Sequence, residues 1–119
     1  MNILILDDNP IMTMVLSDHF ADRGHSVIPA YDPNLGLLFC DRKYFDVLII
    51  DYVLPGINGI DVLQLMRKKN KSTRAIIITG FPELLQGESD RMKELDVEAV
   101  IEKPFDFSQL DELIEKQVV

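Results

Sequence analysis

The chain has 119 residues, of which 47% are hydrophobic, and it carries a formal charge of −8 at pH 7. This length suits one hydrophobic core, so we expect a single domain over residues 1–119. The acidic excess argues against direct binding of nucleic acid, which requires clustered Lys and Arg. No apolar run approaches the roughly 20 residues of a membrane span, and acidic residues follow the N-terminus too soon for a signal peptide. We expect a soluble, cytoplasmic protein with no membrane partner.

Five apolar runs predict five strands. In chain order they are Ile3–Leu6, Val27–Ile28, Val47–Ile50, Ala75–Ile78 and Ala99–Ile101. The second is the shortest. The other four are rich in aliphatic residues and show no alternation, which is typical of strands buried on both faces of a parallel sheet.

Helical periodicity follows each predicted strand. The helices are expected to begin at Asn9-Pro10, at Asp32-Pro33, at Asn58-Gly59, between Glu83 and Glu88, and near Ser108, where Asp111 completes the spacing of a capping box. The fourth is interrupted by Gly87 and is the likeliest mobile region by composition. The residues expected to pack inward are Met12, Val15, Leu16 and Phe20, then Leu35, Leu38 and Phe39, then Val62, Leu63 and Met66, then Leu84, Leu85, Met92 and Leu95, and finally Leu110, Leu113, Ile114 and Val118.

Five strand–helix units predict an α/β fold with one parallel sheet. Right-handed crossovers place helices on both faces of the sheet, which gives a three-layer sandwich. We expect the strand order 2-1-3-4-5, with a switch point between the first and third strands. Asp7, Asp8 and Asp51 follow those two strands. The cysteine Cys40 lies in the second helix among apolar residues, so we expect a packed free thiol.

Polar residues follow four of the predicted strands, and their types suggest an active site. They are Asp7-Asp8, Asp51, Thr79 and Glu102-Lys103. Carboxylates brought together at one sheet edge repel one another, and Mg²⁺, which prefers oxygen ligands, would relieve that repulsion. Asp51 is predicted to be a nucleophile that accepts a phosphoryl group, with Lys103 neutralising charge and Thr79 donating a hydrogen bond.

Each of these residues also has a simpler explanation when it is taken singly. Asp7-Asp8 could cap a helix, Asp51 could end a strand before a turn, and Lys103 could be a surface lysine. Their joint position at the ends of successive strands favours the site.

The chain as a whole resembles the receiver domain of bacterial two-component response regulators. The resemblance rests on Asp7-Asp8, on Asp51 followed by Pro55 and Gly59, on Thr79-Gly80, and on Lys103-Pro104-Phe105. It implies a flavodoxin-like (βα)5 fold in which Asp51 accepts a phosphoryl group from a sensor histidine kinase or phosphotransfer protein. A downstream protein or a fused output domain would respond. The chain would be either a stand-alone receiver or the receiver piece of a longer regulator, and not an enzyme.

The resemblance also implies a role for each site residue. Asp8, Asp51 and the backbone carbonyl of Val53 would bind Mg²⁺ directly, and Asp7 would act mainly through water. Thr79 and Lys103 would hold the phosphoryl group, and the Lys103-Pro104 peptide would be cis.

The sequence departs from the family at two positions. Val100 stands where a Tyr or Phe usually couples to the threonine, so we expect phosphorylation to act through the loop from Gly80 to Gly87 and the fourth helix. Asp96 stands where a helix-ending Gly is common, and Asp tolerates a left-handed conformation better than most residues.

Three other functions share features of this pattern. A Mg²⁺-dependent phosphatase of the haloacid-dehalogenase type needs a second acid where Val53 stands, which disfavours it. A flavodoxin-like electron carrier needs a Gly- and hydroxyl-rich phosphate loop, where this chain has Asp7-Asp8-Asn9-Pro10. A phosphorylation-independent binding module, or pseudo-receiver, stays open because of Val100.

Overall fold

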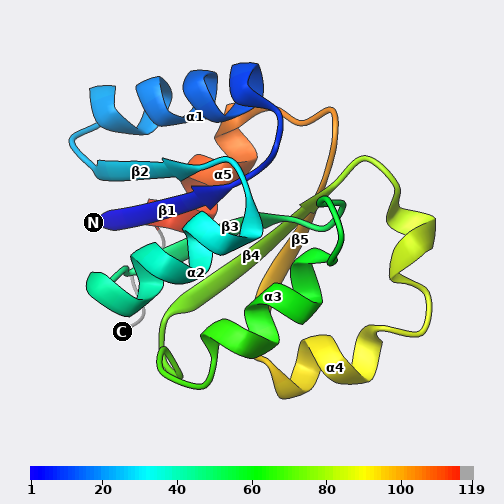
Figure 1. The fold of residues 1–119 in the computed structure, drawn as a ribbon. Coiled ribbons are helices and arrows are strands. Elements are labelled where there is room, and N and C mark those ends of the chain that lie inside the picture. The colour runs from blue at the N-terminus through cyan, green and yellow to red at the C-terminus, as the bar shows by residue number, and fades with distance from the viewer. Residues whose placement is uncertain (116–119) are drawn as a thin grey trace.

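The computed structural model describes residues 1–115, which form a three-layer α/β sandwich (Figure 1). Five parallel strands make one sheet in the order β2-β1-β3-β4-β5. Their bounds are Asn2–Leu6 for β1, Ser26–Ala30 for β2, Val47–Asp51 for β3, Arg74–Thr79 for β4 and Val97–Glu102 for β5. This is the topology of the flavodoxin-like fold, and it confirms the predicted strand order.

The helices cover both faces of the sheet. Their bounds are Pro10–Asp22 for α1, Pro33–Arg42 for α2, Gly59–Met66 for α3, Ser89–Glu94 for α4 and Phe107–Glu115 for α5, with a 3₁₀ turn, η1, at Pro82–Leu85. Helices α1 and α5 lie on one face of the sheet and α2 and α3 on the other (Figure 1). Their side chains pack into two separate cores. Within the described residues, no helix is long and apolar enough to cross a membrane.

Side chains of the three central strands alternate between two cores. In β1, Leu4 and Leu6 contribute to the core under α2 and α3, whereas Ile3 and Ile5 contribute to the core under α1 and α5. This confirms the prediction that the central strands are buried on both faces of the sheet. The same prediction was wrong for β5, in which only Ile101 is buried, because β5 is an edge strand with one neighbour.

Side chains cap the first three helices at the predicted positions. Asn9, Asp32 and Asn58 each accept hydrogen bonds from backbone N–H groups in the first turn of their helix. The predicted cap of the last helix was wrong. Helix α5 begins at Phe107, and the Gln109 side chain accepts the Asp106 N–H at 3.3 Å. This contact of the capping-box type lies two residues before the predicted pair, Ser108 and Asp111.

Several residues predicted to pack inward are exposed. The side chains of Val15, Leu38 and Leu84 are 42%, 40% and 50% exposed. The buried face of α2 consists of Pro33, Gly36 and Cys40, whose small size lets the helix lie close to the sheet. The predicted packing of Val118 lies outside the described residues.

The segment between β4 and β5 is irregular, as Gly87 indicated. A single 3₁₀ turn comes first, Gly87 adopts φ +83°, and α4 then begins at Ser89, one residue beyond the predicted range of starts. Asp96 takes a left-handed conformation with φ +53° after α4, the conformation for which Gly is common at this position. The Lys103-Pro104 peptide is cis, which confirms that expectation.

Gly59 lies directly against the backbone of Asp51. A Cβ atom at Gly59 would overlap the Asp51 carbonyl oxygen and lie 3.0 Å from Ile50 Cγ2. We expect Gly59→Ala to lower the free energy of unfolding by about 1–3 kcal/mol, because backbone must shift to admit the methyl group. Urea denaturation measures this change. Gly36→Ala in α2 is the matched control, since its Cβ would meet only movable side-chain atoms and should change stability by no more than about 1 kcal/mol. Equal stability of both variants would contradict the prediction.

Cys40 is buried in α2 and behaves as a packing residue. Its side chain is 7% exposed, and burial, helped by the charge of Asp41, raises the pKa of the thiol to about 11. Since the thiolate is the reactive form, we expect a thiol reagent at pH 8 to modify the folded protein at least about a hundredfold more slowly than the urea-unfolded chain. Equal rates would show that the thiol is accessible in the fold.

Candidate functional site

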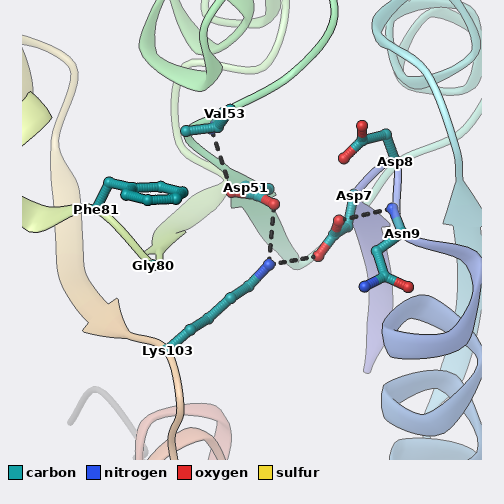
Figure 2. A pocket seen from close by; sticks show the side chains of 8 residues that line it. All are labelled: Asp7, Asp8, Asn9, Asp51, Val53, Gly80, Phe81 and Lys103. Carbon is teal, nitrogen blue, oxygen red and sulfur yellow. Dashed lines mark hydrogen bonds and ion pairs between the residues drawn. The ribbon is translucent and has the colours of Figure 1, made fainter.

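A pocket of about 220 Å³ opens at the carboxyl edge of the sheet. It is lined by Asp7, Asp8, Asn9, Asp51, Val53, Gly80, Phe81 and Lys103 (Figure 2). The predicted site residues therefore meet in one place, with the exception of Thr79, whose side chain is fully buried and does not line the pocket.

The parallel sheet explains why residues so distant in sequence converge. Asp7-Asp8 directly follow β1, Asp51 is the last residue of β3, and Lys103 directly follows β5. Because β1 and β3 are neighbours in register, their ends meet, and one carboxylate oxygen from each of the three acids lies within 4.8 Å of the others. This is the switch point at which open α/β sheets bind ligands.

Lys103 joins two of the carboxylates. Its Nζ donates to Asp7 Oδ2 at 3.1 Å and to Asp51 Oδ2 at 2.9 Å, as Figure 2 shows. Backbone N–H groups hold the second oxygen of each acid: Asn9 donates to Asp7 at 2.9 Å and Val53 donates to Asp51 at 3.2 Å. Asp7 and Asp51 are only 3% and 7% exposed, whereas Asp8 is exposed at the mouth of the pocket. The two buried carboxylates are thus fixed in orientation.

The charges in the pocket do not balance. Burial raises the pKa of Asp51, and the neighbouring Asp7 carboxylate adds to this rise, while Lys103 opposes it. Burial by itself lowers the pKa of Lys103, but hydrogen bonds to Asp51 and Asp7 outweigh it and the net direction is upward. Lys103 therefore stays protonated. Its single positive charge does not compensate the neighbouring carboxylates, and the pKa of Asp51 remains raised.

The donor set fits a hard divalent cation. Asp7, Asp8 and Asp51 offer carboxylate oxygens within 4.8 Å of one another, on the open side of a pocket that also contains Val53. Mg²⁺ favours oxygen ligands. It usually binds one or two carboxylates, and water molecules and phosphate oxygens occupy its other ligand positions. Such a cation would supply the positive charge that Lys103 alone does not.

Thr79 connects the pocket to the loop after β4. Its hydroxyl accepts the Phe81 N–H at 3.0 Å, and its carbonyl accepts the Lys103 N–H at 2.8 Å. Ile77, two residues earlier on β4, faces the core under α2 and α3, whereas Ile49, two residues before Asp51, faces the other core. Thr79 and Asp51 thus end their strands on opposite faces.

One supporting residue was missed in the sequence. The buried Thr13 hydroxyl bonds the carbonyls of Asp7 and Asn9, and so fixes the start of α1 against the end of β1. Its position four residues after the capping Asn9, within an otherwise apolar helix face, was the available signal.

The strand order and a pocket at the switch point define a flavodoxin-like α/β protein. A sequence model of the response regulator receiver domain matches residues 3–115. The chain belongs to this family, the receivers of two-component systems, and the resemblance seen in its motifs is confirmed.

Two relatives differ in how much of their own length this chain covers. Sporulation initiation phosphotransferase F of Bacillus subtilis is 28% identical over 114 residues, which cover 96% of this chain and 90% of that protein. Response regulator ArlR of Staphylococcus aureus is 33% identical over 110 residues, which cover 91% of this chain but 48% of that protein. The chain thus spans nearly all of one relative and about half of the other.

Solved structures share the fold. A CheY-like receiver domain protein from Methanospirillum hungatei superposes with a TM-score of 0.88 at 25% identity, covering 96% of this chain and 90% of the other. TrrA from Thermotoga maritima, crystallised in complex with Mg²⁺-BeF, superposes with a TM-score of 0.84 at 24% identity, covering 96% of each chain.

Proposed function

We propose that Asp51 accepts a phosphoryl group from a sensor histidine kinase or phosphotransfer protein in a Mg²⁺-dependent reaction. Phosphorylation would change the surface of the domain to which a downstream protein or a fused output domain binds. We propose that this takes place in the cytoplasm. The observation that supports this most strongly is the Asp51 carboxylate itself, which lies in an acidic pocket 2.9 Å from the ammonium of Lys103.

The family resemblance implies which residues would hold the cation, and the pocket brings these residues together. Asp8, Asp51 and the Val53 carbonyl would be direct ligands, and Asp7, already bound to Lys103, would act through water. Bound Mg²⁺ would neutralise the carboxylates and the oxygens of the incoming phosphoryl group.

Residues of the chain would carry out the transfer. An Asp51 oxygen forms a bond to phosphorus while the bond from phosphorus to the donor imidazole nitrogen breaks, and the electron pair leaves with the imidazole. The Val53 N–H orients the carboxylate, since it already donates to Asp51 Oδ1. Lys103 would pair with the phosphoryl oxygens, and the Thr79 hydroxyl would donate to one of them in place of its present contact with Phe81.

The pocket has an apolar residue where a phosphatase of the haloacid-dehalogenase type needs a second acid. Val53 presents an apolar side chain that is 41% exposed, where such an enzyme needs an acid to protonate its leaving group. We therefore propose a phosphoacceptor rather than an enzyme. The alternative is a binding module that does not depend on phosphorylation, because the exposed Val100 stands where the family usually has an aromatic ring. The following experiment tests this alternative.

Incubation with phosphoramidate, a donor with a phosphorus–nitrogen bond, tests the proposal. We expect intact mass to show one added phosphoryl group in the presence of Mg²⁺ and almost none after chelation, because the uncompensated carboxylates repel the donor. Equal modification in both samples would contradict the role of the cation. The absence of modification in Mg²⁺ would leave the domain as a binding module.

A further inference from the structure

Core packing holds helix α4 only weakly. None of its six residues is buried, and the half-buried Met92 is its one contribution to the core under α2 and α3. In Figure 1 the helix lies at the edge of the molecule near α3. Polar contacts therefore hold the helix, together with Met92 and the C-cap Leu95, which pack against that core.

Arg91 makes the first set of contacts. Its Nη2 donates to Asp61 Oδ1 at 2.6 Å and to Gln64 Oε1 at 2.9 Å, both on α3, while Nη1 lies 3.3 Å from both oxygens of Glu88. The guanidinium thus links a fixed helix to the residue that ends the loop after β4. Arg91 and Asp61 are 34% and 41% exposed, so water screens this link and it can be broken.

Arg67 makes the second set at the opposite end of α4. Directly after α3, its Nε donates to the Leu95 carbonyl at 2.9 Å, and Nη1 bonds the carbonyls of Asn70 and Thr73. Leu95 is the C-cap of α4. Because three backbone carbonyls hold this guanidinium, the C-terminal end of α4 is anchored more firmly than the end that Arg91 holds.

The backbone of Tyr52 connects the phosphoacceptor to α3. The residue follows Asp51 and is 9% exposed, its N–H donates to Ile78 at 2.8 Å, and its carbonyl accepts the Gly59 N–H at 2.7 Å. Tyr52, the residue after the phosphoacceptor, is thus joined to the first residue of α3, the helix that carries Asp61.

The loop after β4 provides a second connection. The Phe81 N–H binds the Thr79 hydroxyl, and Glu88 is the last residue of the segment that begins at Gly80. If Thr79 turns toward a phosphoryl group, Phe81 loses its partner, and the segment that carries Glu88 is free to move away from Asp61.

We propose that Arg91 is a latch that holds α4 against α3, and that phosphorylation of Asp51 opens it about a hinge at Arg67. The surface that changes is then the α3–α4 side rather than β5, where Val100 offers no ring to reorient. This inference rests on the proposed function for its trigger, whereas the latch itself does not depend on phosphate.

Hydrogen exchange across residues 88–95 tests the latch. We expect Arg91→Gln to raise exchange of the unphosphorylated protein about tenfold, because charge-assisted hydrogen bonds that close the segment are lost. Asp61→Asn should act in the same direction. Lys93→Gln is the matched control, since Lys93 is exposed on the same helix and makes none of these contacts. Exchange in Arg91→Gln equal to that in Lys93→Gln would overturn the latch.

Beryllofluoride with Mg²⁺ tests the trigger in the same assay. In the parent we expect it to raise exchange in residues 88–95 toward the level of Arg91→Gln, and to have little further effect in that variant. A filled site, shown by bound beryllium, with unchanged exchange would overturn the coupling. Failure of beryllium to bind would contradict the proposed function, while the effect of Arg91→Gln alone would still decide whether the latch exists.

Discussion

Asp51→Asn is expected to abolish phosphorylation by a small phosphodonor in Mg²⁺. The amide has nearly the same shape and can still accept the Val53 N–H, which now lies 3.2 Å from Asp51 Oδ1, but it is not a nucleophile. Intact mass should show no added phosphoryl group under conditions that modify most of the parent. Modification of the variant as full as that of the parent would mean that another residue is the acceptor.

Two further variants separate the roles of the neighbouring residues. Asp8→Ala should suppress phosphorylation by removing an exposed carboxylate ligand, and added Mg²⁺ should restore it in part. Lys103→Ala should still accept the phosphoryl group to some extent but should lose the response of residues 88–95, because the ammonium that contacts Asp51 belongs to the residue whose N–H binds Thr79, at the start of the loop after β4. If all three variants lost phosphorylation equally, these separate roles would be wrong.

The phosphorylated form of Asp51 is expected to be long-lived for a receiver. An acyl phosphate is lost when water attacks phosphorus in line, and Val53 and Phe81 line the pocket through which that water must enter. They are 41% and 54% exposed, and neither can hydrogen-bond and orient a water. In Figure 2 the ring of Phe81 flanks Asp51 on the side opposite Asp7 and Asp8.

Val53→Asn combined with Phe81→Glu should hasten this decay by about tenfold or more, because a positioned amide or acid can orient the attacking water. Intact mass followed over time after removal of the donor gives the rate. Leu84→Gln is the control, since Leu84 is an equally exposed apolar residue that does not line the pocket. Unchanged or slower decay in the double variant would show that these side chains do not govern water access.

The site was predictable because strand ends can be read from a sequence. Runs such as Val47–Ile50 end sharply on a charged residue, and the topology of a parallel sheet then brings those ends together. The same reasoning misplaced inward-facing residues on the helices. Periodicity gives a helix face only to within a residue, so it could not tell the exposed Val15 from the buried Thr13 beside Leu16.

The contacts of α4 could not be predicted in the same way. Arg91 is one of many charged residues in its segment, and its partners Asp61 and Gln64 lie on another helix. Nothing in local spacing joins them, because these contacts connect two helices that are separated in sequence by β4 and an irregular loop. The sequence indicated a weak helix but not the arginine that holds it.

Reduction of the phosphorylated protein with borohydride tests the assignment of Asp51 most directly. An aspartyl phosphate is an acyl phosphate, so the hydride converts that one side chain to an alcohol, and peptide mass spectrometry then identifies the residue. We predict homoserine at position 51 in the parent treated with phosphodonor and Mg²⁺, and none in a sample without donor. Homoserine at position 7 or 8, or a phosphate on the Thr79 hydroxyl that survives reduction, would contradict the assignment of Asp51 as the phosphoacceptor.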